Sequence, residues 1–122
     1  MSCNFTVLDR GKPVNVGLLR RHRFQLRQHT PDPGIKNFQN YIDSQKHMAS
    51  KAAETKATVL LSNHSEFDNA VNKNRMLAGR GDGPHSYELG VDSVQRRFPV
   101  MQGCARAVQL KLEQQVAGSA MP

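Results

Sequence analysis

Residues 57–64 read Ala57-Thr58-Val59-Leu60-Leu61-Ser62-Asn63-His64, a short apolar run that ends in a polar loop. A nearly continuous apolar run of this length is typical of a buried strand in a parallel sheet. The run predicts such a strand over 57–62, with His64 in the loop at its carboxyl end. Open α/β sheets place their ligands at this edge. His64 is therefore the first candidate functional residue, because neutral imidazole is a natural metal ligand.

The segment before this strand predicts a hairpin and a helix. Residues 4–9 and 14–18 alternate loosely between apolar and polar types on either side of a Gly/Pro turn, as in a β-hairpin. After a loop at 30–34, apolar residues recur at helical spacing from Ile35 to about residue 55. The strand at 57–62 would follow this amphipathic helix.

Two further helices are expected after the strand. One covers 66–78 and turns four apolar residues inward, namely Phe67, Ala70, Val71 and Leu77. The other begins near Val91 and steps by three and four residues to Leu112, which is the seam of a helix packed on a core. Pro99 lies inside that seam and predicts a kink or a break, because proline removes a backbone N–H and crowds the preceding turn. The overall pattern indicates an α/β fold.

Length and composition limit the function classes. The chain has 122 residues, about one domain, and 17 Lys+Arg against 10 Asp+Glu give a net charge of +7. No apolar run approaches the roughly 18 residues of a membrane span, and the N-terminus lacks the pattern of a signal peptide. We therefore expect no membrane association and predict no export, while the compartment stays open. Cys3 and Cys104 lie far apart without a CxxC spacing, so we expect reduced thiols, with Cys104 buried beside the helical seam.

Three polar residues near His64 are candidates to orient its ring by hydrogen bonding, namely Asn63, Glu66 and Asp68. Glu66 and Asp68 could equally stabilise the start of the next helix, where carboxylates interact favourably with exposed N–H groups. Both interpretations follow from the same spacing.

Three motifs in order carry a family resemblance. Residues 60–68, 83–90 and 92–96 together resemble the C-terminal part of metallo-β-lactamase-fold hydrolases, and the similarity extends over roughly residues 31–112. The resemblance implies a zinc-dependent hydrolase acting on a small-molecule substrate, with metal-activated water as the nucleophile. It also implies that His64 is a zinc ligand, because a histidine after this late strand binds metal in that family.

The resemblance also implies what the chain lacks. The family's other ligands come chiefly from an HxHxDH motif that this sequence does not contain, and catalytic zinc needs about three protein ligands. We therefore expect a C-terminal fragment that is inactive alone, holds no zinc stably and has no catalytic residue of its own. Its expected architecture is a partial αββα sandwich without the N-terminal half, so that exposed apolar faces favour association. The expected divisions are a hairpin with an atypical stretch at 1–30, the α/β segment at 31–116 and a tail at 117–122.

The atypical stretch supplies most of the excess charge. Four arginines lie within it, namely Arg20, Arg21, Arg23 and Arg27, and they leave only +3 for the remaining chain. Relatives in the resembled family tend to have a glycine pair here, and GGC-GGC-ACC read one base early after C becomes CGG-CGG-CAC, which encodes Arg-Arg-His. We hypothesise a compensated frameshift over about residues 17–29. The alternative is a small basic protein that binds nucleic acid or another polyanion through residues 20–29, although only Phe24 is available there for base stacking.

Two other motifs predict no function. The tripeptide Arg80-Gly81-Asp82 matches a cell-adhesion motif, but it lies in a glycine-rich segment that predicts a turn. The serines have no nucleophile-elbow context, so a serine hydrolase is not supported.

Overall fold

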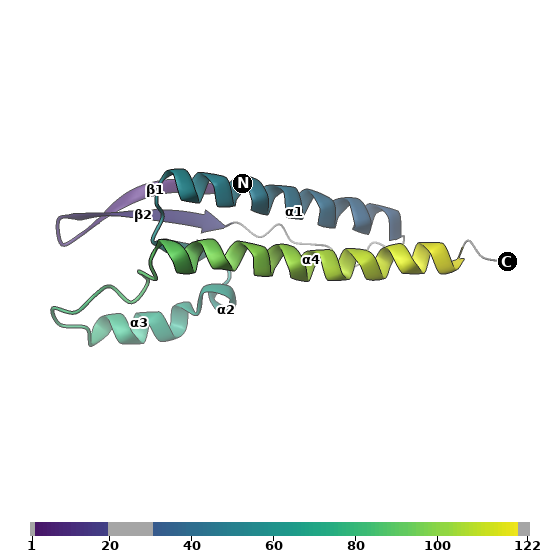
Figure 1. Ribbon diagram of the computed structural model, residues 1–122. Helices are drawn as coiled ribbons and strands as arrows, with labels where there is room; N and C mark the ends of the chain where they lie inside the picture. The colour runs from purple at the N-terminus through teal and green to yellow at the C-terminus, as the bar shows by residue number, and fades with distance from the viewer. Residues whose placement is uncertain (1, 20–30, 120–122) are drawn as a thin grey trace.

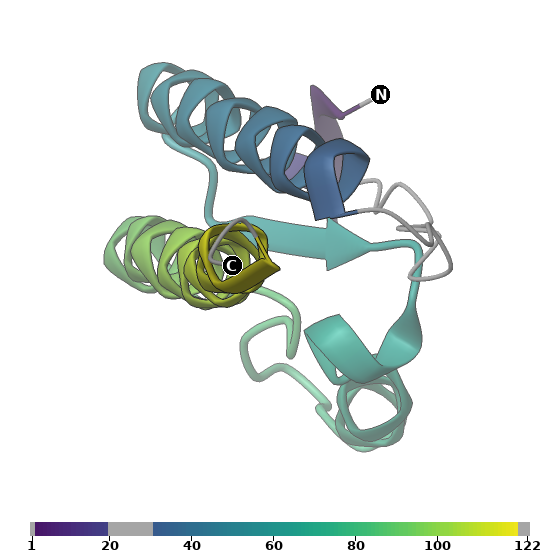
Figure 2. The same ribbon diagram turned by 90° about the vertical axis from the view of Figure 1, so that its right-hand side faces the viewer.

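The computed structural model describes residues 2–19 and 31–119, which form one mixed sheet and four helices (Figure 1). Helices α1 and α4 run side by side along one face of the sheet, and α2 and α3 lie below α4 (Figures 1 and 2). In chain order the elements are β1 (Cys3–Asp9), β2 (Lys12–Leu19), α1 (Pro31–Glu54), β3 (Val59–Ser62), α2 (Ser65–Asp68), α3 (Ala70–Ala78) and α4 (Val91–Ser119).

The sheet has the order β1-β2-β3 and confirms both strand predictions. Strands β1 and β2 form an antiparallel hairpin around Arg10 and Gly11, which both have positive φ angles of 50° and 81°. Such a two-residue turn matches the right-handed twist of the flanking strands. Strand β3 pairs in parallel with β2, from Val16 opposite Val59 to Leu19 opposite Ser62. The loop after β3 therefore begins beside the end of β2.

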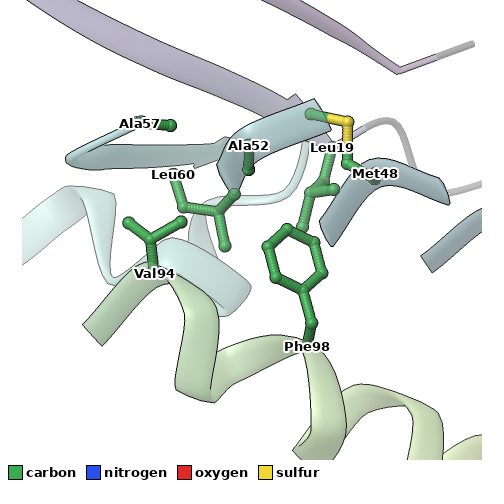
Figure 3. Close-up of a cluster of buried hydrophobic side chains, with 7 residues drawn as sticks. All are labelled: Leu19, Met48, Ala52, Ala57, Leu60, Val94 and Phe98. Carbon is green, nitrogen blue, oxygen red and sulfur yellow. The ribbon is translucent and has the colours of Figure 1, made fainter. Parts of the chain in front are cut away.

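The helix–sheet core, defined here as seven buried side chains, joins α1 and α4 to the sheet (Figure 3). Leu19 and Leu60 project from the sheet toward the helices, and Phe98 of α4 meets them with its ring fully buried. Burial of apolar surface on this scale is the main stabilising contribution in a small domain. The members of the core are Leu19, Met48, Ala52, Ala57, Leu60, Val94 and Phe98.

The long helices correct two expectations about proline. Helix α1 begins at Pro31, inside the segment expected to be a loop, because proline fits the first turn of a helix, where N–H groups have no intrahelical partner. Helix α4 continues through Pro99 as one element to Ser119, so the predicted break is wrong. The Pro99 ring is exposed, while the turns before and after it are anchored by the buried Phe98 and Ala105. These anchors offset the lost hydrogen bond.

The apolar seam of α4 is also shifted. Val108 was expected inside and is exposed, whereas the neighbouring Gln109 is buried. The Gln109 amide donates hydrogen bonds to the Ile35 carbonyl at 3.1 Å and to Gln39 Oε1 at 3.0 Å, both on α1. Cross-helix hydrogen bonds make this burial possible, since a buried amide without partners is costly. Cys104 is exposed, so its predicted burial is wrong as well.

The segment at 66–78 forms two helices instead of one. Asn69 separates α2 from α3 in the left-handed conformation, with φ 57° and ψ 36°, which asparagine tolerates better than most residues. Phe67 of α2 and Val71 of α3 were both expected to point inward, and both are exposed. The buried residue of α3 is Lys73.

The expected partial αββα sandwich is wrong. The described residues contain a single three-stranded mixed sheet with helices, and no second sheet faces it. The sheet face turned away from α1 and α4 carries a small cluster of Val14, Val16 and Val59, against which Leu61 and Tyr87 pack. A loop side chain covers part of this face, where a sandwich would place another layer of strands. The long α4 includes residues 117–119, which were expected in the tail.

Candidate functional site

His64 lies where the apolar strand predicted it, directly after β3 and before α2. Its backbone is extended, its N–H donates to Ser62 Oγ at 3.3 Å and its carbonyl accepts the Phe67 N–H at 3.1 Å. The exposed imidazole makes an edge-on contact with the Phe67 ring, with centroids 6.0 Å apart. The ring is therefore held from one side and open to solvent from another.

Asp68 organises the backbone around His64. The buried carboxylate accepts the Ser62 N–H at 2.9 Å through Oδ2 and the Ala70 N–H at 3.1 Å through Oδ1. These bonds join the last residue of β3 to the first residue of α3, and we call the enclosed residues 62–70 the His64 loop. Bonds to a charged carboxylate are stronger than neutral ones. Asp68 therefore acts on His64 by shaping the loop, through contacts with backbone amides.

The other candidate orienting residues are more peripheral. Asn63 and Glu66 are both exposed, and Glu66 lies in the first turn of α2. At this position the carboxylate of Glu66 can interact favourably with the exposed N–H groups at the start of α2, which was the alternative role considered for it. Within residues 2–19 and 31–119, the contact found for the His64 ring is the one with Phe67.

The donor set around His64 does not fit a complete catalytic zinc site. Among the residues that the structure describes, no group of three or more His, Cys, Asp or Glu side chains comes together. His85 lies in the loop before α4, where its Nδ1 accepts the Tyr87 N–H at 3.2 Å, and His47 is exposed on α1. Catalytic zinc needs about three protein ligands, and the described residues do not place both a second and a third such side chain beside His64. His22 and His29 lie outside the described residues.

A buried lysine beside the His64 loop was not predicted. Lys73 is 8% exposed, and its Nζ lies 5.2 Å from the centroid of the Tyr87 ring, a cation–π distance. The pKa of Lys73 is lowered from its ordinary value, chiefly because the amine is buried. The nearby charge of Asp68 opposes this shift, and the charge of Arg97 adds to it. Apolar periodicity could not predict that Lys73 is buried. A pattern of apolar residues counts lysine as polar, although its aliphatic stem can be buried.

The adhesion-like tripeptide takes part in an internal contact. The Arg80 guanidinium forms a two-pronged ion pair with Asp9, at 2.7 and 3.1 Å, and its side chain is mostly buried. Arg10 in turn donates to the Gly81 carbonyl and lies 3.8 Å from Asp82. The Arg80 hydrogen bond holds the pKa of Asp9 below its ordinary value. These contacts tie the hairpin turn to the loop after α3, which agrees with the structural interpretation of the tripeptide.

The arginine-rich stretch falls outside the described residues, including Arg20, Arg21, Arg23 and Arg27. No described helix is long and apolar enough to cross a membrane. Comparisons of the chain with protein-family models, with curated proteins and with solved structures find no match.

Proposed function

We propose that this chain supplies His64 as one zinc ligand of a hydrolase of the metallo-β-lactamase family, with the remaining ligands encoded upstream of the codon for Met1. The observation that supports the proposal is the exposed imidazole of His64 at the carboxyl end of β3. The backbone that carries it is held by two hydrogen bonds that the Ser62 and Ala70 N–H groups donate to the Asp68 carboxylate. A preorganised, solvent-accessible imidazole suits a ligand that completes a metal site.

The same proposal requires that the chain by itself is inactive. One imidazole leaves zinc without most of its protein ligands, and the described residues offer no cluster that could replace them. The carboxylate of Asp68 is already engaged by two backbone N–H groups. Under this proposal, zinc binding and hydrolysis belong to a longer polypeptide that includes this chain.

The first experiment is metal analysis of the purified chain after equilibrium dialysis against zinc chloride. We expect substoichiometric zinc, with no difference between wild type, His64→Ala and the control His47→Ala, which changes another exposed histidine. Stoichiometric zinc that is lost only in His64→Ala would contradict the proposal, because the chain alone would then hold the metal.

The second experiment is sequencing of the DNA upstream of the codon for Met1, followed by expression of the extended chain. We expect a frame that encodes HxHxDH, and an extended chain that retains zinc and loses affinity for it in His64→Ala but not in His47→Ala. An upstream sequence without such a frame would overturn the proposal. So would an extended chain whose zinc affinity is unchanged in His64→Ala.

A further inference from the structure

Strand β1 forms one edge of the sheet in the part of the chain that the structure describes. Strand β1 is first in the order β1-β2-β3, and no described strand lies beyond it. An edge strand presents unpaired N–H and C=O groups, and native proteins commonly protect it with lysines, prolines, bulges or a covering element. Strand β1, with the sequence CNFTVLD, contains neither lysine nor proline.

The hairpin register identifies the groups at this edge. Asp9 and Lys12 flank a two-residue turn and form a hydrogen-bonded pair, and such pairs alternate with non-bonded ones along the hairpin. Pro13 lies opposite Leu8 at a non-bonded position, which fits because proline has no N–H. By this alternation Asn4, Thr6 and Leu8 direct their backbone N–H and C=O groups away from β2.

The side chains of β1 are mostly uncharged and suit contact with another strand of the same kind. Phe5 and Val7 are both about two-fifths exposed and share one face of the strand, and Leu8 on the other face is 72% exposed. The one charged residue of β1, Asp9, is paired with Arg80. The chain as a whole has a net charge of +7, but β1 contains no lysine or arginine. Two copies can therefore approach along this edge with little electrostatic repulsion.

We propose that β1 pairs antiparallel with β1 of a second copy, about a two-fold axis at Thr6. In this register Thr6 lies opposite Thr6 of the second copy and Asn4 lies opposite Leu8, so that the outward backbone groups bond to one another. Phe5 then lies opposite Val7 at the closer, non-bonded positions, where apolar cross-strand pairs stabilise a sheet. The interface is self-complementary, as a two-fold contact requires. The two three-stranded sheets become one continuous sheet.

The test is sedimentation velocity over a range of concentrations for wild type, Thr6→Lys and Thr6→Val. Both substitutions remove the bond from Thr6 Oγ1 to Asn15 Oδ1 at 2.8 Å, but only lysine places like charges opposite one another at the axis. We expect a concentration-dependent dimer for wild type and Thr6→Val. For Thr6→Lys we expect a dimer Kd at least about tenfold higher, equivalent to about 1.4 kcal/mol. Circular dichroism checks that all three variants are folded.

A cysteine scan then locates the contact. In a Cys3→Ser, Cys104→Ser background, Thr6→Cys should form a disulfide-linked dimer under mild oxidation, whereas Lys46→Cys on the exposed side of α1 should not. A wild-type chain that stays monomeric at its highest soluble concentration overturns the proposal. So does a dimer that Thr6→Lys leaves intact, or one that Thr6→Val weakens equally, since the contact would then lie elsewhere or depend on the hairpin alone.

Discussion

The helix–sheet core and the His64 loop are held by different forces. In the core, buried apolar side chains from α1, α4 and the sheet converge on Phe98. In the loop, Phe67 is exposed, and the backbone is held by the carboxylate of Asp68. The difference indicates that the core carries most of the global stability. The loop rests on a few polar contacts, so its geometry should be far more sensitive to one substitution than the fold is.

The largest expected effect comes from removing the Phe98 side chain from the helix–sheet core. Phe98→Ala should lower the free energy of unfolding by about 3–5 kcal/mol, because it removes a fully buried ring and leaves a cavity. Val100→Ala, two positions along α4 and exposed, should change it by less than about 0.5 kcal/mol. Urea denaturation followed by circular dichroism measures both. Equal losses would mean that α4 does not pack on the sheet through this face.

A smaller effect is expected from the carboxylate of the His64 loop. Asp68→Ala should cost about 1–3 kcal/mol, because it leaves the N–H groups of Ser62 and Ala70 without their acceptor. The imidazole resonances of His64 should shift in the NMR spectrum of this variant, since the loop backbone is no longer held. Glu66→Ala, an exposed carboxylate two residues earlier, is the matched control and should leave stability and resonances nearly unchanged. Identical spectra for Asp68→Ala and wild type would show that Asp68 does not position His64.

The smallest effect is a pH dependence at the hairpin turn. The hydrogen bond from Arg80 lowers the folded-state pKa of Asp9 below its ordinary 3.8, so the pair stabilises the fold above that pH. This contribution declines as pH falls through the folded-state pKa. The melting temperature of wild type should exceed that of Arg80→Gln near neutrality, and the gap should narrow below pH 3.8. Asp82→Asn, at a fully exposed carboxylate, should show no such narrowing, and a constant gap for Arg80→Gln would contradict the assignment.

The His64 loop separates what local pattern could predict from what it could not. The apolar run before His64 predicts β3 and places the imidazole at its carboxyl end, because strand burial follows from composition over a few residues. The role of Asp68 was not predictable in this way. Its carboxylate could equally orient a side chain or accept backbone N–H groups, and only the folded loop brings it onto the N–H groups of Ser62 and Ala70.

The hairpin, the parallel strand and the helical character of the regions around α1 and α4 could be predicted from local patterns, because apolar periodicity and turn residues are local signals. Tertiary structure decided which positions became buried. Gln109 replaced Val108 inside because α1 supplied its hydrogen-bond partners. Arg80 forms its ion pair with Asp9, which lies 71 positions earlier in the chain. Such contacts depend on distances between elements, and these distances follow from packing and are not encoded in any local pattern.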